Sequence, residues 1–281
     1  LSLFPEIPHA WGSIIIVLGL ISGLAGVLFA IGQHDLKRLL AYHSIENIGI
    51  ILMGLGIALF GKSYDKPVLV VLGMSGCLLH VWNHCFFKSL LFLCAGSVVH
   101  STRTRQIDLL GGLAKSMPLT AAMFLIGAVA ICGLPPLNGF ISELFIYLGF
   151  FRIVANGPEG LAVAFGAPVL AAIGALATAC FVKVYGAVFL GSPRSNCSDA
   201  CHESPFFMTV PKFILAGLCI LIGIAPMLFT DTISKAVAIW NPAMQLGSIS
   251  PDSVAPLLKI SILSIALIAG VLIISLVILC G

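Results

Sequence analysis

The segment His80-Val-Trp-Asn-His84-Cys-Phe-Phe-Lys88 places titratable side chains at four-residue intervals inside an apolar stretch. In a helix, His84 lies about 40° and Lys88 about 80° round the axis from His80, so all three share one face. Histidine exchanges protons near neutral pH, and a lysine removed from water loses its proton more readily. The pattern therefore indicates a route for protons through intervening water. Two other interpretations stay open: a pair of metal ligands, or histidines that hydrogen-bond neighbouring helices.

A carboxylate follows an interruption in a second apolar stretch. Glu143 comes directly after Gly133-Leu-Pro-Pro-Leu-Asn-Gly139, where consecutive prolines remove backbone donors and break any helix. A carboxylate near a helix start is favoured by the helix dipole, so Ser142 or Glu143 could simply cap the helix that follows. Alternatively, Glu143 is a titratable site where two half-helices expose backbone groups to water, as in the midplane sites of transporters.

Further ionisable residues lie beside or inside other apolar stretches. Lys37 precedes one stretch and is either a flanking charge or part of the route. His43 and Glu46 lie one helical turn apart and could share a proton or form an ion pair. Lys183 lies about two turns from the end of its stretch, so it either reaches back to the interface or joins the route. A charge at membrane depth costs about 2.5–3.5 kcal/mol on insertion scales, which makes each a functional candidate.

The elements that position these residues must be membrane helices, because the composition leaves no other solvent for them. Of 281 residues, 59% are hydrophobic and 9% charged, and the mean hydropathy is +1.14. A soluble domain carries about 25% charged residues. The net charge of +3 is too small to indicate nucleic-acid binding. The chain starts with Leu1, shows no signal-peptide pattern and begins just before an apolar stretch, so we expect a fragment of a longer polypeptide.

A helix that spans a bilayer needs about 20 mostly apolar residues. The stretches that qualify are 11–31, 39–60, 68–99, 118–151 with its interruption, 161–190, 207–229 and 256–280. The sequence thus predicts an all-α, polytopic transmembrane helix bundle. The interrupted stretch is either a tight hairpin that crosses twice or one crossing made of two half-helices. For one crossing, the positive-inside rule makes cytoplasmic the side that carries Lys37, Arg38, Arg103, Arg105, Lys115, Arg194 and Lys212.

Apart from the pair His80 and His84, the sequence indicates no bound metal, and nothing in it indicates a redox cofactor. Most of the nine cysteines lie in or beside apolar stretches, where they are typical small core residues. Cys197, Cys201 and His202 share a polar loop, but their spacing fits neither the haem attachment motif nor half of a zinc site. No glycine loop for phosphate appears. Small residues such as Gly19 and Gly23 instead indicate close helix packing.

Segments 34–49, 80–88 and 134–143 together resemble the antiporter-like membrane subunits of respiratory complex I, multisubunit sodium/proton antiporters and membrane-bound hydrogenases. The amino-acid sequences of segments 41–47 and 138–143 are most similar to those of the family branch found in hydrogenase-4 and formate hydrogenlyase. The resemblance implies that residues 1–190 form the second five-helix inverted repeat of such a subunit, with its discontinuous helix at 118–151. Residues 191–281 would be a C-terminal extension with two spans. The resemblance therefore favours the single broken crossing.

The resemblance also implies roles for the polar residues. The family's central polar axis would comprise Lys37, His80, His84, Lys88 and Glu143, with Lys88 as its central lysine and Glu143 as the exit-side group. His43 and Glu46 match the sequence motif of the hydrogenase-type branch. Lys183 remains a further candidate for the proton route. The first repeat of the family is absent, so we expect only the outlet half of a channel.

We therefore expect a proton-translocating subunit of a redox-driven complex in a bacterial or archaeal cytoplasmic membrane, with no cofactor in this chain. Its partners would be the lipid bilayer, other membrane subunits, and peripheral iron–sulfur and nickel–iron subunits of hydrogenase type. One alternative is a structural anchor for a hydrogenase arm. Another is a sodium/proton antiporter subunit, which would need several convergent oxygen ligands. A continuous polar track from Lys37 through Lys88 to Glu143 would favour transport over anchoring.

Overall fold

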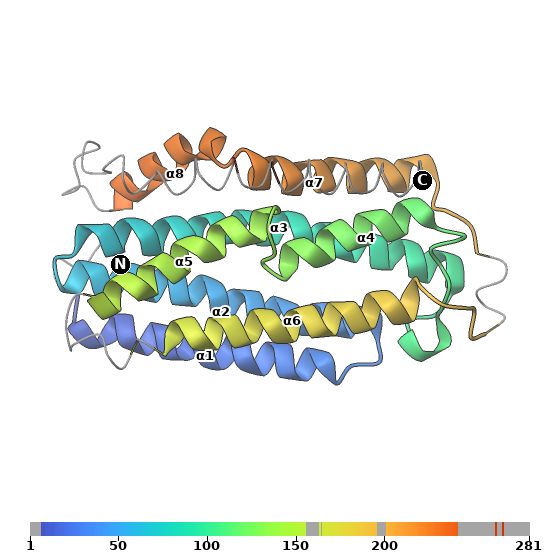
Figure 1. Cartoon of the computed structure of the whole chain (residues 1–281), viewed down its shortest axis with the longest axis horizontal. Helices are drawn as coiled ribbons and strands as arrows, with labels where there is room; N and C mark the ends of the chain where they lie inside the picture. The colour runs from blue at the N-terminus through green and yellow to red at the C-terminus, as the bar shows by residue number, and fades with distance from the viewer. Residues whose placement is uncertain are drawn as a thin grey trace.

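The computed structural model describes residues 7–155, 163, 165–195, 201–240, 262 and 266, and these residues form a helical bundle without β-strands. Figure 1 shows the helices lying side by side with their axes roughly aligned. Within the described residues, 6 helices are long and apolar enough to cross a membrane, which confirms the predicted fold class. The helices are α1 (His9–Ile31), α2 (Leu36–Ser63), α3 (Pro67–Thr102), α4 (Pro118–Ile131), α5 (Asn138–Ala155), α6 (Gly166–Val188), α7 (Phe206–Ile224) and α8 (Met227–Trp240).

The helices follow the predicted spans closely up to α6. The span predicted at 207–229 is interrupted, because α7 ends at Ile224 and α8 begins at Met227, after Pro226. An apolar window does not register a proline, which lacks the N–H that would continue the helix. The span predicted at 256–280 lies outside the described residues, apart from 262 and 266. The division of the chain at residue 190 stays a prediction.

Helices α4 and α5 lie end to end along α3 (Figure 1). Gly127 of α4 packs against Leu91, and Ile146 of α5 packs against Gly76 near the other end of α3. Residue numbers therefore fall along α3 as they rise along α4 and α5. The pair runs antiparallel to α3 in a single pass, so it forms one crossing of two half-helices. The hairpin interpretation is wrong.

The break between the half-helices brings a carboxyl group against the backbone. Gly133 has a φ of +62°, a conformation that glycine adopts without steric cost, and the Pro135–Pro136 bond is cis. A Cβ added to Gly133 would lie 2.6 Å from the carboxyl carbon of Glu143. Glycine is therefore needed here both for its backbone conformation and for the space that Glu143 fills.

Helices α1 and α2 approach each other through glycines, as the small-residue spacing predicted. A Cβ added to Gly49 would lie 2.5 Å from the carbonyl oxygen of Gly19, and one added to Gly26 would lie 2.8 Å from the Cα of Glu46. Such contact needs residues without side chains at the crossing. The opposite face of α1 exposes the large apolar side chains of Ile14, Val17, Leu18, Ile21, Leu28 and Phe29.

Helix α2 begins before its predicted start because Asp35 caps it. The Asp35 carboxylate accepts hydrogen bonds from the backbone N–H groups of Lys37 at 2.9 Å and Arg38 at 3.0 Å. The Nε of Arg105 lies 3.4 Å from the same side chain, which joins the start of α2 to the segment after α3. Lys37 therefore lies in the first helical turn, at one end of the bundle.

Candidate functional site

His80 joins three helices at the centre of the bundle. It is fully buried on α3. Its Nε2 donates to Oδ1 of Asn47 on α2 at 3.1 Å, and its Nδ1 lies 2.9 Å from Oγ of Ser142 on α5. Both nitrogens of the imidazole are thus engaged without direct contact to water. The structure places His80 beside the helix break, where the sequence predicted a proton route.

Ser142 gives this contact two possible states. Its hydroxyl carries one proton and has two acceptors in reach, Nδ1 of His80 at 2.9 Å and the carbonyl oxygen of Gly139 at 2.9 Å. When the hydroxyl donates to His80, the imidazole is neutral. When the hydroxyl turns to Gly139, Nδ1 becomes the donor and the imidazole is charged. Rotation of one hydroxyl therefore accommodates the loss or gain of a proton.

Two asparagines fix the half-helix start against α3. Nδ2 of Asn83 donates to the backbone carbonyl of Asn138 at 2.7 Å and to Oγ of Ser142 at 3.0 Å. Nδ2 of Asn138 donates back to Oδ1 of Asn83 at 3.2 Å. Sequence reasoning missed both asparagines. The available signal was that Asn83 follows His80 by three residues and so faces the same neighbour.

A second pair lies beside His80 on α2. His43 Nδ1 contacts Oε2 of Glu46, and both side chains are buried. The amide of Asn47 donates to the carbonyl oxygen of His43 at 2.7 Å, which links the pair to the residue that holds His80. The ring of His43 lies 4.7 Å from that of Phe181 on α6, and its Nε2 has no hydrogen-bond partner in the described structure. The predicted i,i+3 contact is thus formed.

Lys88 points from α3 to the same stretch of α2. Its ammonium donates to the carbonyl oxygen of Leu40, and its side chain is 7% exposed. The nitrogen lies 5.9 Å from the ring centroid of Phe92, a distance at which the ring face attracts a cation. Leu40, His43 and Asn47 follow one another at helical spacing on α2. This helix therefore carries a stripe that leads from Lys88 to His80.

His84 and Glu143 lie close to this network but are not hydrogen-bonded to it. His84 is half-buried against the edge of Phe87, and its Nε2 has no partner within the described residues. Glu143 is 6% exposed and sits one residue after Ser142. No hydrogen bond between described residues joins Glu143 to His80 or Lys88.

Lys37 and Lys183 lie at one end of the bundle. Lys37 is one helical turn before Leu40, the residue whose carbonyl binds Lys88. Lys183 is exposed, and its ammonium donates to the carbonyl oxygen of Ile31, the last residue of α1, at 3.1 Å. A cation at a helix C-terminus is favoured by the helix dipole. That contact is the role the structure gives Lys183.

Lys212 is a buried residue that the sequence interpretation treated as a flanking charge. It lies in α7 with its side chain fully buried, hydrogen-bonded to hydroxyls from two other helices. The positive-inside rule counts Lys212 among the charges of the cytoplasmic side, and the structure shows that its side chain is buried between helices rather than exposed there. A lysine near a helix end can reach water or a buried partner, and only the neighbouring helices decide which.

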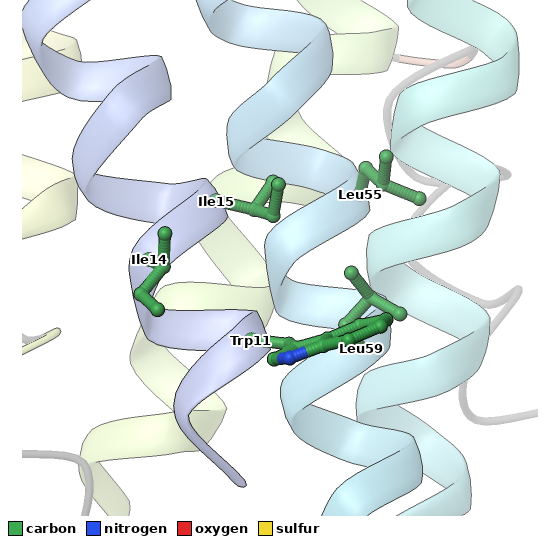
Figure 2. Close-up of a pocket in the computed structure, with 5 residues that line it drawn as sticks. All are labelled: Trp11, Ile14, Ile15, Leu55 and Leu59. Carbon is green, nitrogen blue, oxygen red and sulfur yellow. The ribbon is translucent and has the colours of Figure 1, made fainter. Parts of the chain in front are cut away.

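The described residues place no group of three or more histidines, cysteines, aspartates or glutamates where a metal could bind. The pair Cys197 and Cys201 lies partly outside the described structure, because Cys197 is not described. Figure 2 shows an apolar pocket of about 320 Å³ between α1 and α2, lined by Trp11, Ile14, Ile15, Leu55 and Leu59. None of these five side chains can titrate near neutral pH, so the pocket is separate from the polar network.

Comparison with known proteins places this fold in one class. Residues 1–170 match the family described as "NADH:quinone oxidoreductase/Mrp antiporter, TM". The chain belongs to this family of antiporter-like membrane subunits, which confirms the resemblance seen in its motifs.

Two relatives from Escherichia coli (strain K12) are hydrogenase subunits by name. Hydrogenase-4 component B is 40% identical over 279 residues, which cover 94% of this chain and 41% of that protein. Formate hydrogenlyase subunit 3 is 43% identical over 235 residues, which cover 82% of this chain and 38% of that protein. The chain thus spans about two fifths of the length of these relatives.

Solved membrane complexes contain the same fold. A chain of the Mrp complex from Dietzia sp. DQ12-45-1b superposes with a TM-score of 0.71 and 21% identity, covering 83% of this chain and 48% of that one. A chain of the archaeal membrane-bound sulfane sulfur reductase gives a TM-score of 0.64 and 31% identity, covering 79% of this chain and 34% of that one. A chain of respiratory complex I from Thermus thermophilus superposes with a TM-score of 0.67 and 22% identity, covering 82% of this chain and 44% of that one.

Proposed function

We propose that this chain conducts protons as part of a membrane complex, with Lys88 as the switching site. The observation that carries the proposal is the contact between His80 and Ser142 at the broken helix. This contact can hold or release a proton by the rotation of one hydroxyl.

The proposed route uses the stripe on α2. A proton leaving Lys88 passes along the pair His43 and Glu46, and through water, to His80. Ser142 then turns, and water carries the proton on to Glu143, one residue further on α5. Positive charge arriving near Lys88 raises the cost of keeping its proton and drives the transfer. Lys37 lies one helical turn before Leu40, whose carbonyl oxygen binds Lys88, and it links the route to the end of the bundle.

The proposed parent is a hydrogenase-type complex in a bacterial or archaeal cytoplasmic membrane. Support comes from the two relatives named as hydrogenase-4 and formate hydrogenlyase subunits. Other membrane subunits, together with peripheral iron–sulfur and nickel–iron subunits, would be the partners that supply the driving reaction.

The test is Lys88→Ala in the full-length subunit, assembled in its membrane complex and reconstituted into liposomes. We expect coupled proton movement, followed with a pH-sensitive dye, to be abolished while the complex still assembles. Lys183→Ala is the matched control, because Lys183 contacts only a helix end at the edge of the bundle.

Three outcomes separate the candidate functions. Loss of proton movement with intact assembly supports conduction. Full proton movement in Lys88→Ala would overturn Lys88 as the switching site and would favour a role for the chain as an anchor of the complex. Coupled uptake of ²²Na⁺ that disappears with Lys88→Ala, without proton movement, would identify a sodium carrier.

A further inference from the structure

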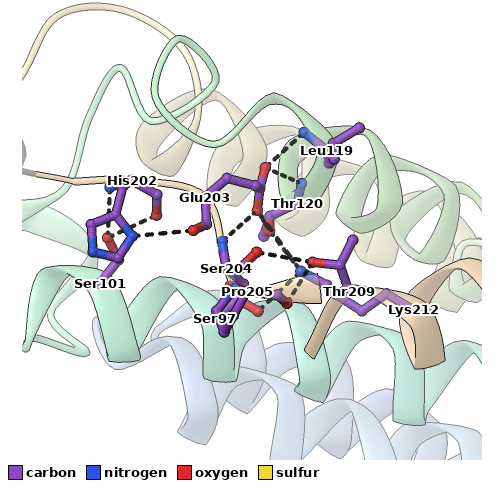
Figure 3. A network of polar contacts seen from close by, with 10 residues as sticks. All are labelled: Ser97, Ser101, Leu119, Thr120, His202, Glu203, Ser204, Pro205, Thr209 and Lys212. Carbon is purple, nitrogen blue, oxygen red and sulfur yellow. Dashed lines mark hydrogen bonds and ion pairs between the residues drawn. The ribbon is translucent and has the colours of Figure 1, made fainter. Parts of the chain in front are cut away.

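A second polar cluster lies at the end of the bundle where α3 ends and α4 and α7 begin (Figure 3). Its central residue is Lys212 of α7. The ammonium donates to Oγ1 of Thr120 on α4 at 2.8 Å and to Oγ of Ser97 on α3 at 3.1 Å. Glu203 Oε1 lies 4.0 Å from the same nitrogen. The hydroxyl of Thr120 donates to that carboxylate oxygen at 2.5 Å and so bridges the lysine and the glutamate.

The two charged groups differ in their access to water. Lys212 is fully buried, whereas the Glu203 side chain is 22% exposed. Glu203 is also held by the backbone N–H groups of Leu119 at 2.9 Å, Thr120 at 3.1 Å and Ser204 at 3.0 Å. It thereby caps the start of α4 from outside the helix. A carboxylate held at the surface and a buried ammonium are thus joined by one hydroxyl.

We infer that Glu203, Thr120 and Lys212 form a proton port, a relay that passes protons between the water at this end of the bundle and its interior. The inference rests on the proposed function and adds a site to it. None of the predicted site residues belongs to this cluster.

Each transfer along the relay conserves the number of protons, whether the proton enters from water or leaves to it. A proton taken from water forms an O–H bond on Glu203 when Lys212 is neutral. That proton moves to Oγ1 of Thr120, while the original hydroxyl proton of Thr120 moves to Nζ of Lys212. Glu203 is again a carboxylate, Thr120 again carries one proton, and Lys212 is an ammonium. The reverse sequence releases a proton to water.

The interior end of the port lies on the same face of α3 as the residues at the helix break, about 21 Å along that helix. Ser97 and Asn83 lie fourteen residues apart on α3, so they are about 40° apart round its axis and share a face. On α7, Cys219 follows Lys212 by seven residues, about 10 Å along the helix, and its side chain contacts that of Asn138. Water along this seam would carry protons between Lys212 and the asparagine pair beside Ser142.

The experiment compares Thr120→Val with Thr120→Ser in the reconstituted, full-length complex. Valine keeps the shape of threonine and the backbone N–H that binds Glu203, but removes the bridging hydroxyl. Serine restores the hydroxyl. We expect Thr120→Val to reduce the proton flux by about tenfold, and Thr120→Ser to retain it. Thr102→Val is the control, because this buried hydroxyl at the same end contacts only backbone groups.

A purely structural role is excluded by a second measurement. Glu203→Gln keeps an oxygen that accepts the α4 hydrogen bonds but cannot relay a proton in the same way. We expect its flux per assembled complex, measured well below the unfolding midpoint, to fall like that of Thr120→Val. Normal flux in both variants would overturn the port. If Lys88→Ala abolishes flux in the same preparation, the proposed function survives that result. Normal flux in Lys88→Ala, with loss in Thr120→Val, would overturn only the role of Lys88.

Discussion

Two polar clusters of the bundle hold charge differently. The central cluster joins α3 and α5 and comprises His80, Asn83, Asn138 and Ser142. The end cluster joins α3, α4 and α7 and comprises Ser97, Thr120, Glu203 and Lys212. In the end cluster, the buried cation faces a carboxylate that also binds backbone N–H groups. In the central cluster, a hydroxyl proton has two acceptors and the imidazole beside it can change its charge. In the proposed port, an ion pair exchanges its proton through the hydroxyl of Thr120, whereas in the centre a single imidazole changes its charge as the hydroxyl of Ser142 rotates.

The largest expected effect comes from His80→Gln in the central cluster. Glutamine is of similar size and can bond Asn47 and Ser142, but it does not take up a proton near neutral pH. We expect proton flux to fall by about a hundredfold, the lower range for loss of a general acid–base group. Stability should change by about 1 kcal/mol or less.

Flux and thermal unfolding of the same preparation check this prediction. A variant that conducts normally would show that the imidazole of His80 carries no proton along the route.

A smaller effect on proton flux but a larger effect on stability is expected for Lys212→Met in the end cluster. Methionine fills a similar volume but leaves the carboxylate of Glu203 without its cation. Removal of one partner of a buried pair costs about 3–5 kcal/mol, and the partial exposure of Glu203 reduces this to about 2 kcal/mol. The thermal unfolding midpoint of the purified protein in detergent measures the loss. An unchanged midpoint would mean that the ion pair between Lys212 and Glu203 does not stabilise the fold.

The smallest effect is a pH dependence that belongs to the end cluster. Burial raises the pKa of Glu203, but hydrogen bonds from Thr120 and Ser204 and the charge of Lys212 outweigh it, so the pKa lies below its ordinary value of 4.5. A lowered pKa stabilises the fold above the unfolded-state value, and this stability is lost as the pH falls through the folded-state value.

We therefore expect the temperature of the unfolding midpoint to fall as the pH is lowered below about 4.5. The fall should be smaller in Glu203→Gln. The difference between the two unfolding curves isolates this residue from the other carboxylates. Parallel curves would show that protonation of Glu203 does not weaken the end cluster.

Much of the fold could be predicted because it follows from local chemistry. The apolar stretches set the helices, and the consecutive prolines set the break between α4 and α5. The pair His43 and Glu46 also followed from spacing alone, since residues three apart in a helix meet. These features depend on neighbours in the chain.

The partners of the candidate site could not be predicted in the same way. The spacing of His80, His84 and Lys88 predicted a shared face, but not that Asn47 and Ser142 would hold the first while His84 has no partner for Nε2 in the described structure. Asn83 and Asn138 are uncharged, so nothing in their residue type marked them as part of a route.

The sequence by itself determined that the chain lies in a membrane, where the broken helix falls and which titratable groups share a helix face. Hydropathy, proline geometry and the helical repeat fix these features over short distances along the chain. Only the tertiary structure decided that Lys212 is buried, that Glu203 caps α4 and that Ser142 reaches His80. Each depends on side chains more than sixty positions apart in the sequence, which meet only when helices pack.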